Sequence, residues 1–236
     1  MRLVHGLLLA LVFATPVIAQ AQQPAEAAPW QAEIEHRRQS LIERNGPGTD
    51  APLRDQLLSM QASDQEARGL KVDPNAPKGP VRVAANLAEI DKFLSDQLKG
   101  IVEKRGWPTI ALVGIDGSNA AMLLLTHTPD REWQRSLLPK LADLADAGKI
   151  DGSSLALVID KDLIATGHLQ RYGSQFKLVD GAMAMYAVED PAGLDRRRAE
   201  VMLPPIDVYE HRLMAMYHLK VSKQIVMARA ETAKRP

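Results

Sequence analysis

His127 is the side chain in this sequence best suited to proton transfer, because the unperturbed pKa of imidazole lies near neutral pH. Asp160 is a carboxylate that could orient the ring, and we take the two as candidate catalytic residues. A lone histidine at the end of a helix is more often a capping or hydrogen-bonded structural residue. The spacing alone therefore leaves both roles open.

Further polar side chains could hydrogen-bond a ligand. The candidate binding residues are Gln134, Gln170, Tyr172, Gln175 and Arg197. Amide and phenol groups suit a polar pocket, and a guanidinium suits an anionic group. The same groups could instead brace a hairpin against helices or form a solvated helix face. We expect four of the candidates to line one pocket that is partly open to solvent. They are His127, Asp160, Tyr172 and Gln175.

Several chemistries are excluded by what the chain lacks. The sequence has no cysteine, which rules out thiol nucleophiles and disulfides. It contains no Gly-x-Ser-x-Gly, no P-loop and no Gly-x-Gly-x-x-Gly motif. The spacings of His127 from Asp130 and of His211 from His218 match no zinc site. We therefore expect no metal and no cofactor.

The N-terminus has the pattern of a secretory signal. Arg2 precedes the apolar run Leu3–Val12, and Val17-Ile18-Ala19 fits the small-residue cleavage pattern. Residues 1–19 are therefore interpreted as a signal peptide. The alternative, a membrane anchor, is disfavoured because the run is short and broken by Pro16. We expect no membrane span after cleavage and a location in the periplasm or outside the cell.

The rest of the chain divides into a leader, a domain and a tail. Residues 20–29 are rich in Ala, Gln and Pro, which is typical of a disordered leader. Residues 30–220 are expected to form a single, mainly helical domain, and residues 221–236 a basic tail. With 29 basic and 29 acidic side chains, the chain lacks the positive charge that nucleic-acid binding requires. The partner we expect is a small molecule or a component of the cell envelope.

Apolar residues recur at three-to-four spacing, which predicts amphipathic helices. The pattern is clearest over residues 86–105, and Gly106 is the expected C-terminal cap. Further helices are expected over residues 30–44, from Asp50, over 120–126, 128–147 and 155–166, and after Pro191 and Pro205. Residues 155–159 could also form a buried strand.

The pattern changes after residue 169. Residues 170–179 and 182–189 flank Asp180-Gly181, which is a strong signal for a two-residue hairpin. The expected cross-strand pairs are Leu178 with Met183 and Phe176 with Met185. The predicted fold class is therefore mainly α (α+β), a helical domain with one β-hairpin centred on Asp180-Gly181.

Several short motifs together resemble a known bacterial family. They are Gly106-Trp107-Pro108, His127 with Gln134, Asp160, and Gln170-x-Tyr172-Gly173-x-Gln175, followed by a basic helix. The chain resembles the family catalogued as domain of unknown function 6624 over roughly residues 53–209, and Asp64-Gln65-x-x-Arg68 is similar to its N-terminal signature. The chain departs from the family pattern at Lys161, where the family has Arg, and at Ser174, where it has Thr. The resemblance implies a mostly helical domain with a hairpin, and it brings no known activity.

Three functions are compatible with these residues. The first is an exported ligand-binding or accessory module with a polar pocket. The second is an enzyme, such as a hydrolase, with His127 as general base oriented by Asp160. The third is a structural domain in which the same side chains form a buried polar network. The amides and arginines, without a clear nucleophile, favour binding.

Overall fold

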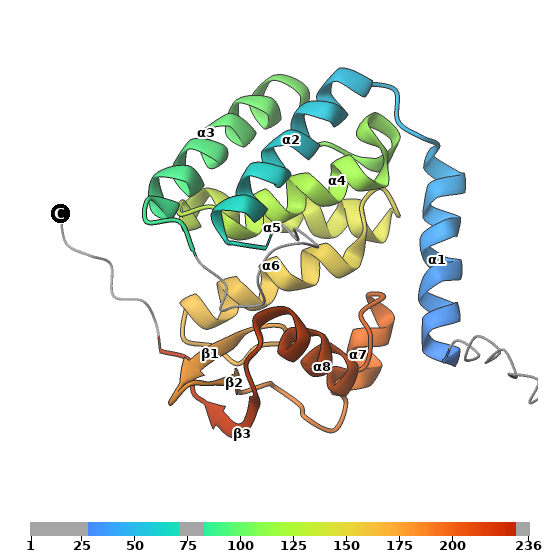
Figure 1. The fold of residues 1–236 in the computed structure, drawn as a ribbon. Helices are drawn as coiled ribbons and strands as arrows, with labels where there is room; N and C mark the ends of the chain where they lie inside the picture. The colour runs from blue at the N-terminus through green and yellow to red at the C-terminus, as the bar shows by residue number, and fades with distance from the viewer. Residues whose placement is uncertain (1–27, 71–82, 230–236) are drawn as a thin grey trace, which may run out of the picture.

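The computed structural model describes residues 28–70 and 83–229, so the expected signal peptide and almost all of the leader lie outside the described residues. The described part folds into helices and a small sheet, drawn in Figure 1. The helices are α1 (Pro29–Asn45), α2 (Ala51–Ala67), α3 (Leu87–Arg105), α4 (Ile110–His127), α5 (Arg131–Asp146), α6 (Gly152–Ala165), α7 (Leu194–Glu200) and α8 (Ile206–Tyr217). The strands are β1 (Phe176–Val179), β2 (Ala182–Tyr186) and β3 (Val221–Val226). The prediction of a mainly helical fold with a hairpin is confirmed.

The centre of the core is α4, which contacts α1, α2, α3 and α6. Its apolar residues, such as Met122 and Leu125, pack against Leu57 of α2 and Leu98 of α3 in one cluster of buried side chains. Among the described residues, α4 is the one helix long and apolar enough to cross a membrane, and 61% of that stretch is buried inside the protein. A core helix of this kind meets the same criteria.

The start of α4 differs from the sequence prediction. The helix was expected over residues 120–126, but it begins at Ile110 and bends at Gly114, where φ is 72° and ψ is 168°. Asp116 instead accepts a hydrogen bond from Arg54 Nε at 2.8 Å. The bend lies where the chain at Gly48 passes so closely that a Cβ there would lie 2.4 Å from the Gly114 nitrogen. Such close backbone contact requires glycine.

The segment that could have been a strand is helical. Leu155 and Val158 are buried within α6, and its N-cap is Asp151, whose side chain accepts from the Ser153 amide at 2.9 Å. With that cap the helix begins at Gly152, three residues before the predicted start at residue 155. The helical prediction for residues 155–159 is therefore confirmed.

The hairpin forms with the predicted register. Phe176 pairs with Met185 and Leu178 with Met183, and the turn at Asp180 and Gly181 has positive φ at both positions. Both strands are shorter than predicted, because residues 170–175 form a loop instead of extending β1.

A third strand was not predicted. Residues 221–236 were assigned to a basic tail, but Val221–Val226 pairs with β2 in parallel orientation to give the sheet order β1-β2-β3. Figure 1 shows this small sheet together with α7 and α8 on the far side of α6 from α2 and α3.

Candidate functional site

His127 ends α4 and contacts a carboxylate from another helix. Its Nδ1 lies 2.8 Å from Oδ1 of Asp64 in α2. The Asp64 side chain is 1% exposed, whereas that of His127 is 20% exposed. The ring therefore has one edge against a buried carboxylate and a part that solvent can reach.

The last turn of α2 surrounds the Asp64 carboxylate with donors. Gln65 Nε2 donates to Oδ2 at 2.9 Å, and Arg68 Nε lies 3.2 Å from Oδ1. The same Arg68 donates through Nη2 to Asp91 of α3 at 2.5 Å. The segment Asp64-Gln65-x-x-Arg68 thus fixes the carboxylate that holds His127.

Two contacts at Nδ1 bear on which nitrogen of the His127 ring carries hydrogen. The Asp64 carboxylate can only accept, so it favours a hydrogen on Nδ1. Arg68 Nε lies 3.0 Å from the same nitrogen and donates to it only in the other tautomer, whereas with a hydrogen on Nδ1 it donates to Asp64. In the tautomer that Asp64 favours, the lone pair of the neutral ring is on Nε2.

The charges around the ring favour its neutral form. Burial lowers the pKa of His127, and the cations Arg68 and Lys161 add to this effect, against the opposing influence of Asp64. Burial raises the pKa of Asp64, but its hydrogen bond with His127 and the charge of Arg68 outweigh this and bring the pKa below its ordinary value. Asp64 is therefore ionised beside a neutral imidazole.

Asp91 behaves in the opposite way to Asp64. Burial raises the pKa of Asp91 above its ordinary value, although Arg68 opposes the shift. Its side chain is 18% exposed, as is that of Arg68. Two nearby carboxylates with pKa shifts of opposite sign are a common arrangement at sites of acid–base chemistry.

Asp160 is not the partner of His127, which corrects the pairing expected from the sequence. Its carboxylate is fully buried and accepts from the backbone amides of Arg171 at 2.7 Å, Tyr172 at 3.0 Å and Ser174 at 2.9 Å. Burial raises the pKa of Asp160, and the three amides oppose the shift. The next residue, Lys161, donates to the carbonyl of Thr126 at 2.5 Å, beside His127.

The loop at residues 170–175 is held by charged groups on both sides. Its amides bind Asp160, and its carbonyls accept from guanidinium groups: Arg197 Nε donates to Arg171 O at 2.9 Å, and Arg198 Nη1 donates to Tyr172 O at 2.6 Å. Arg197 and Arg198 are both buried. Arg197 thus has a bracing contact, one of the two roles left open for it.

Gln170 and Gln134 also make internal hydrogen bonds. Gln170 accepts from the Gln175 amide at 2.9 Å and donates to Tyr186 O at 2.6 Å, which joins the loop to β2. Gln134 is fully buried, and its Nε2 donates to Leu125 O at 2.6 Å. That carbonyl lies two residues before His127, so Gln134 fixes the end of α4.

The structure therefore separates the candidates, which do not line one pocket. His127 contacts Asp64 and Arg68, and Asp160 contacts the loop that contains Tyr172, so their hydrogen-bond partners are different. Gln175 lines a third location, a hollow between β1 and α8. Asp64 and Arg68 were noticed in the sequence only as a family signature. Asp91 was missed, because an acidic residue in an amphipathic helix carries no signal of its own.

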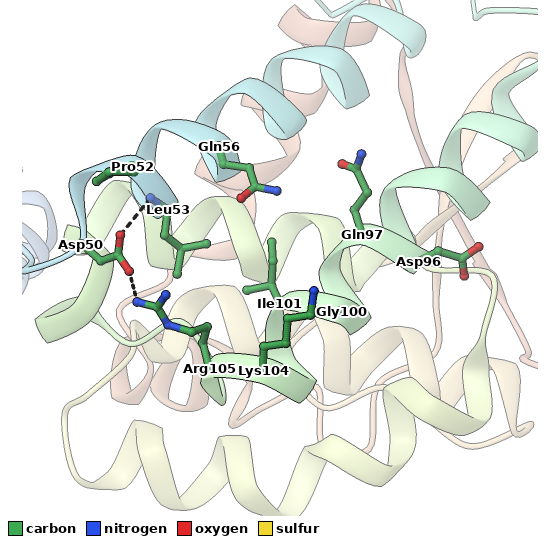
Figure 2. A pocket seen from close by; sticks show the side chains of 10 residues that line it. All are labelled: Asp50, Pro52, Leu53, Gln56, Asp96, Gln97, Gly100, Ile101, Lys104 and Arg105. Atoms are coloured by element: carbon green, nitrogen blue, oxygen red, sulfur yellow. Dashed lines mark hydrogen bonds and ion pairs between the residues drawn. The ribbon is translucent and has the colours of Figure 1, made fainter.

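A separate hollow of about 510 Å³ lies between α2 and α3. Figure 2 shows Gln56 and Gln97 projecting from the two helices above a floor that includes Leu53. At one end Asp50 caps α2 by accepting from the Leu53 amide at 3.1 Å and pairs with Arg105. None of the candidate catalytic or binding residues lines this hollow.

These features define a mainly helical domain with a small mixed sheet and a histidine–carboxylate cluster at the end of its central helix. Residues 51–222 match the family described as a family of unknown function, DUF6624. The match covers more than half of the chain, so the chain belongs to this family, as its motifs suggested. No curated protein matches the chain. No solved structure matches it either.

Proposed function

We propose that the chain is exported and that its mature form is a hydrolytic enzyme in which His127 is the general base. The observation that carries the proposal is the contact of 2.8 Å between His127 Nδ1 and the buried Asp64 carboxylate. It supports a neutral imidazole whose lone pair is on Nε2, which is the form that a general base requires. The substrate is a small molecule or a component of the cell envelope.

In the proposed reaction His127 Nε2 takes a proton from a water molecule as the water oxygen attacks the substrate. The imidazolium that forms is stabilised by the Asp64 carboxylate, which stays ionised. Asp91, whose pKa is raised by burial, supplies a proton to the leaving group. Return of the proton from His127 to Asp91 through solvent restores the starting state.

A binding module without turnover is the second candidate. The His127 ring hydrogen-bonds to Asp64 and Arg68. Within residues 28–70 and 83–229 it makes no hydrogen bond to a serine or threonine hydroxyl that could act as a nucleophile. A covalent mechanism through such a hydroxyl has no support in those residues. Arg68 and Lys161 would then supply positive charge for an anionic ligand.

The test is hydrolysis by the purified mature protein of a panel of esters, amides, phosphoesters and glycosides. His127→Gln should lower the rate on any substrate turned over by about 10²–10⁴-fold. His168→Gln is the matched control, because His168 is exposed and its ring hydrogen-bonds, among the described residues, to Thr166 alone. Circular dichroism establishes that each variant is folded.

Three results would count against the proposal. Undiminished turnover by a folded His127→Gln variant would remove the general base. Binding of panel compounds that needs His127, without any turnover, would favour the binding module. N-terminal sequencing of the protein from the producing cell should give a mature start at Gln20, and an intact Met1 in the cytosol would contradict export.

A further inference from the structure

A hollow of about 330 Å³ lies between the hairpin and α8, which Figure 1 draws next to each other. Phe176 and Met183 of the sheet form one side. Tyr209, Leu213 and Tyr217 of α8 form the other. A volume of this size falls in the range of pockets that hold small molecules.

The helix over this hollow is incompletely packed. No residue of α8 is fully buried, Tyr209 being partly so, although Leu213 and Tyr217 face the sheet across the hollow. Met216 and Tyr217 are 51% and 36% exposed. Protein interiors normally pack with few voids, so an amphipathic helix over an unfilled space forgoes contacts that a bound molecule could supply.

The deep end of the hollow is nevertheless rigid. Tyr209 Oη donates to Ser174 O at 3.2 Å, and the ring lies 4.9 Å from the buried guanidinium of Arg198. Phe176 packs against the same ring with a centroid distance of 6.2 Å. Burial raises the pKa of Tyr209 to about 12, so its phenol stays neutral. These contacts fix the Tyr209 ring, which forms part of the wall of the hollow.

The chemistry of the lining defines the ligand. Lys177 is the one charged residue that the described part of the chain contributes to the lining, and it is exposed. The other lining residues are uncharged, and three of them are aromatic. Gln175 supplies a polar group, since its Oε1 accepts no hydrogen bond from any described residue and its Nε2 has contacts of 3.1 and 3.4 Å.

We propose that this hollow binds a small uncharged molecule with a flat aromatic or apolar body and one hydrogen-bond donor, which Gln175 accepts. The volume is too small for a helix of a partner chain, whose diameter with side chains is about 10 Å or more. The binding site is separate from His127, because none of its lining residues touches that ring. It does not depend on the proposed hydrolysis.

The test uses the mature protein and N-phenyl-1-naphthylamine, an uncharged probe that fluoresces in apolar surroundings and carries one N–H donor. We expect saturable binding with one site per chain. Leu213→Trp, which fills the hollow, should weaken binding at least tenfold. Leu169→Trp is the control, because Leu169 is exposed and lies outside the lining. His127→Gln should leave binding unchanged.

A second comparison holds even if Leu213→Trp fails to fold. Gln175→Leu should weaken binding of the naphthylamine about three- to tenfold, the value of one hydrogen bond. It should not weaken binding of 1-benzylnaphthalene, which has CH₂ in place of the N–H. Equal weakening of both probes would refute the role of Gln175.

Other outcomes overturn the proposal as a whole. Non-saturable binding, or equal binding by the Leu213→Trp and Leu169→Trp variants, would show that the probe does not enter the hollow. Loss of binding in His127→Gln would assign the probe to the other site. Sedimentation that shows a dimer disrupted by Leu213→Trp would show that a second copy of the chain covers this face.

Discussion

Replacing Asp160 by Asn separates the structural role of this residue from the catalytic role that its sequence position suggested. The carboxylate accepts from the amides of Arg171, Tyr172 and Ser174. An asparagine can keep its oxygen toward the first two, but its NH₂ then faces the Ser174 amide, originally 2.9 Å from Oδ2. Two donors would meet in a buried place, and the Ser174 amide would lose its acceptor.

The magnitude follows from that unpaired amide. A buried donor without a partner costs about 1–3 kcal/mol. Burial raises the pKa of Asp160, which means that the charged carboxylate opposes folding, so removal of the charge should offset part of this cost. We expect Asp160→Asn to lower the free energy of unfolding by about 2 kcal/mol, which corresponds to a fall in Tm of about 4–8 °C.

The assay is urea unfolding of the mature protein followed by circular dichroism. Asp162→Asn is the matched control two residues along the same helix, because Asp162 pairs with Arg135 at a site where the arginine is half exposed. Such a pair contributes about 0–1 kcal/mol. Amide exchange at Arg171, Tyr172 and Ser174 should also accelerate in Asp160→Asn. Equal stability of the two variants, or slow amide exchange in the loop, would refute the structural role proposed for the Asp160 carboxylate.

Two further predictions concern the site and its support. Because burial lowers the pKa of His127, the unfolded ring takes up a proton near pH 6.5 before the folded ring does, so stability is full above that pH and falls as the pH drops below it. His127→Gln should remove this part of the pH dependence. The measurement is the free energy of unfolding, from urea unfolding at several pH values between 7 and 5. An equal fall of this free energy in both proteins would contradict the prediction. Gln134→Leu should cost about 0.5–1.5 kcal/mol, since Leu125 O loses the donor at 2.6 Å and keeps the Thr128 amide at 3.3 Å. Thermal melting measures this loss, and an unchanged Tm would show that the Thr128 amide alone satisfies the carbonyl.

The local structure of this chain could be predicted because it depends on neighbours in sequence. Asp50 accepts from the Leu53 amide as an N-cap, and the Gly106 amide closes α3 with a hydrogen bond to Val102 O. Asp180-Gly181 fixes the hairpin and its register, since both positions adopt the positive φ that such a turn requires. These are preferences of the backbone and of short spacings, which a sequence states directly.

The partner of His127 could not be found in this way. Asp160 and Asp64 were both available as carboxylates, and the choice depended on which face of α6 and of α2 packs against the end of α4. In α6, consecutive residues point about 100° apart, so Asp160 reaches the loop at residues 171–174 while Lys161 reaches the Thr126 carbonyl. The packing of α2 on α4 brought Asp64 to the ring.

The same reason explains the missed third strand and the divided set of candidate residues. Val221–Val226 forms a strand because the edge of β2 is free to pair with it. The sequence of this segment alone does not indicate that such an edge lies beside it. In the sequence, Gln170 and Gln175 resemble ligand-binding amides. In the folded chain, most of their hydrogen bonds are made within the loop itself. The sequence determined most of the helices, the caps at Asp50 and Gly106, and the hairpin. The packing of those elements decided which charges meet, because contacts between distant segments depend on helix faces and strand edges that only the folded chain brings together.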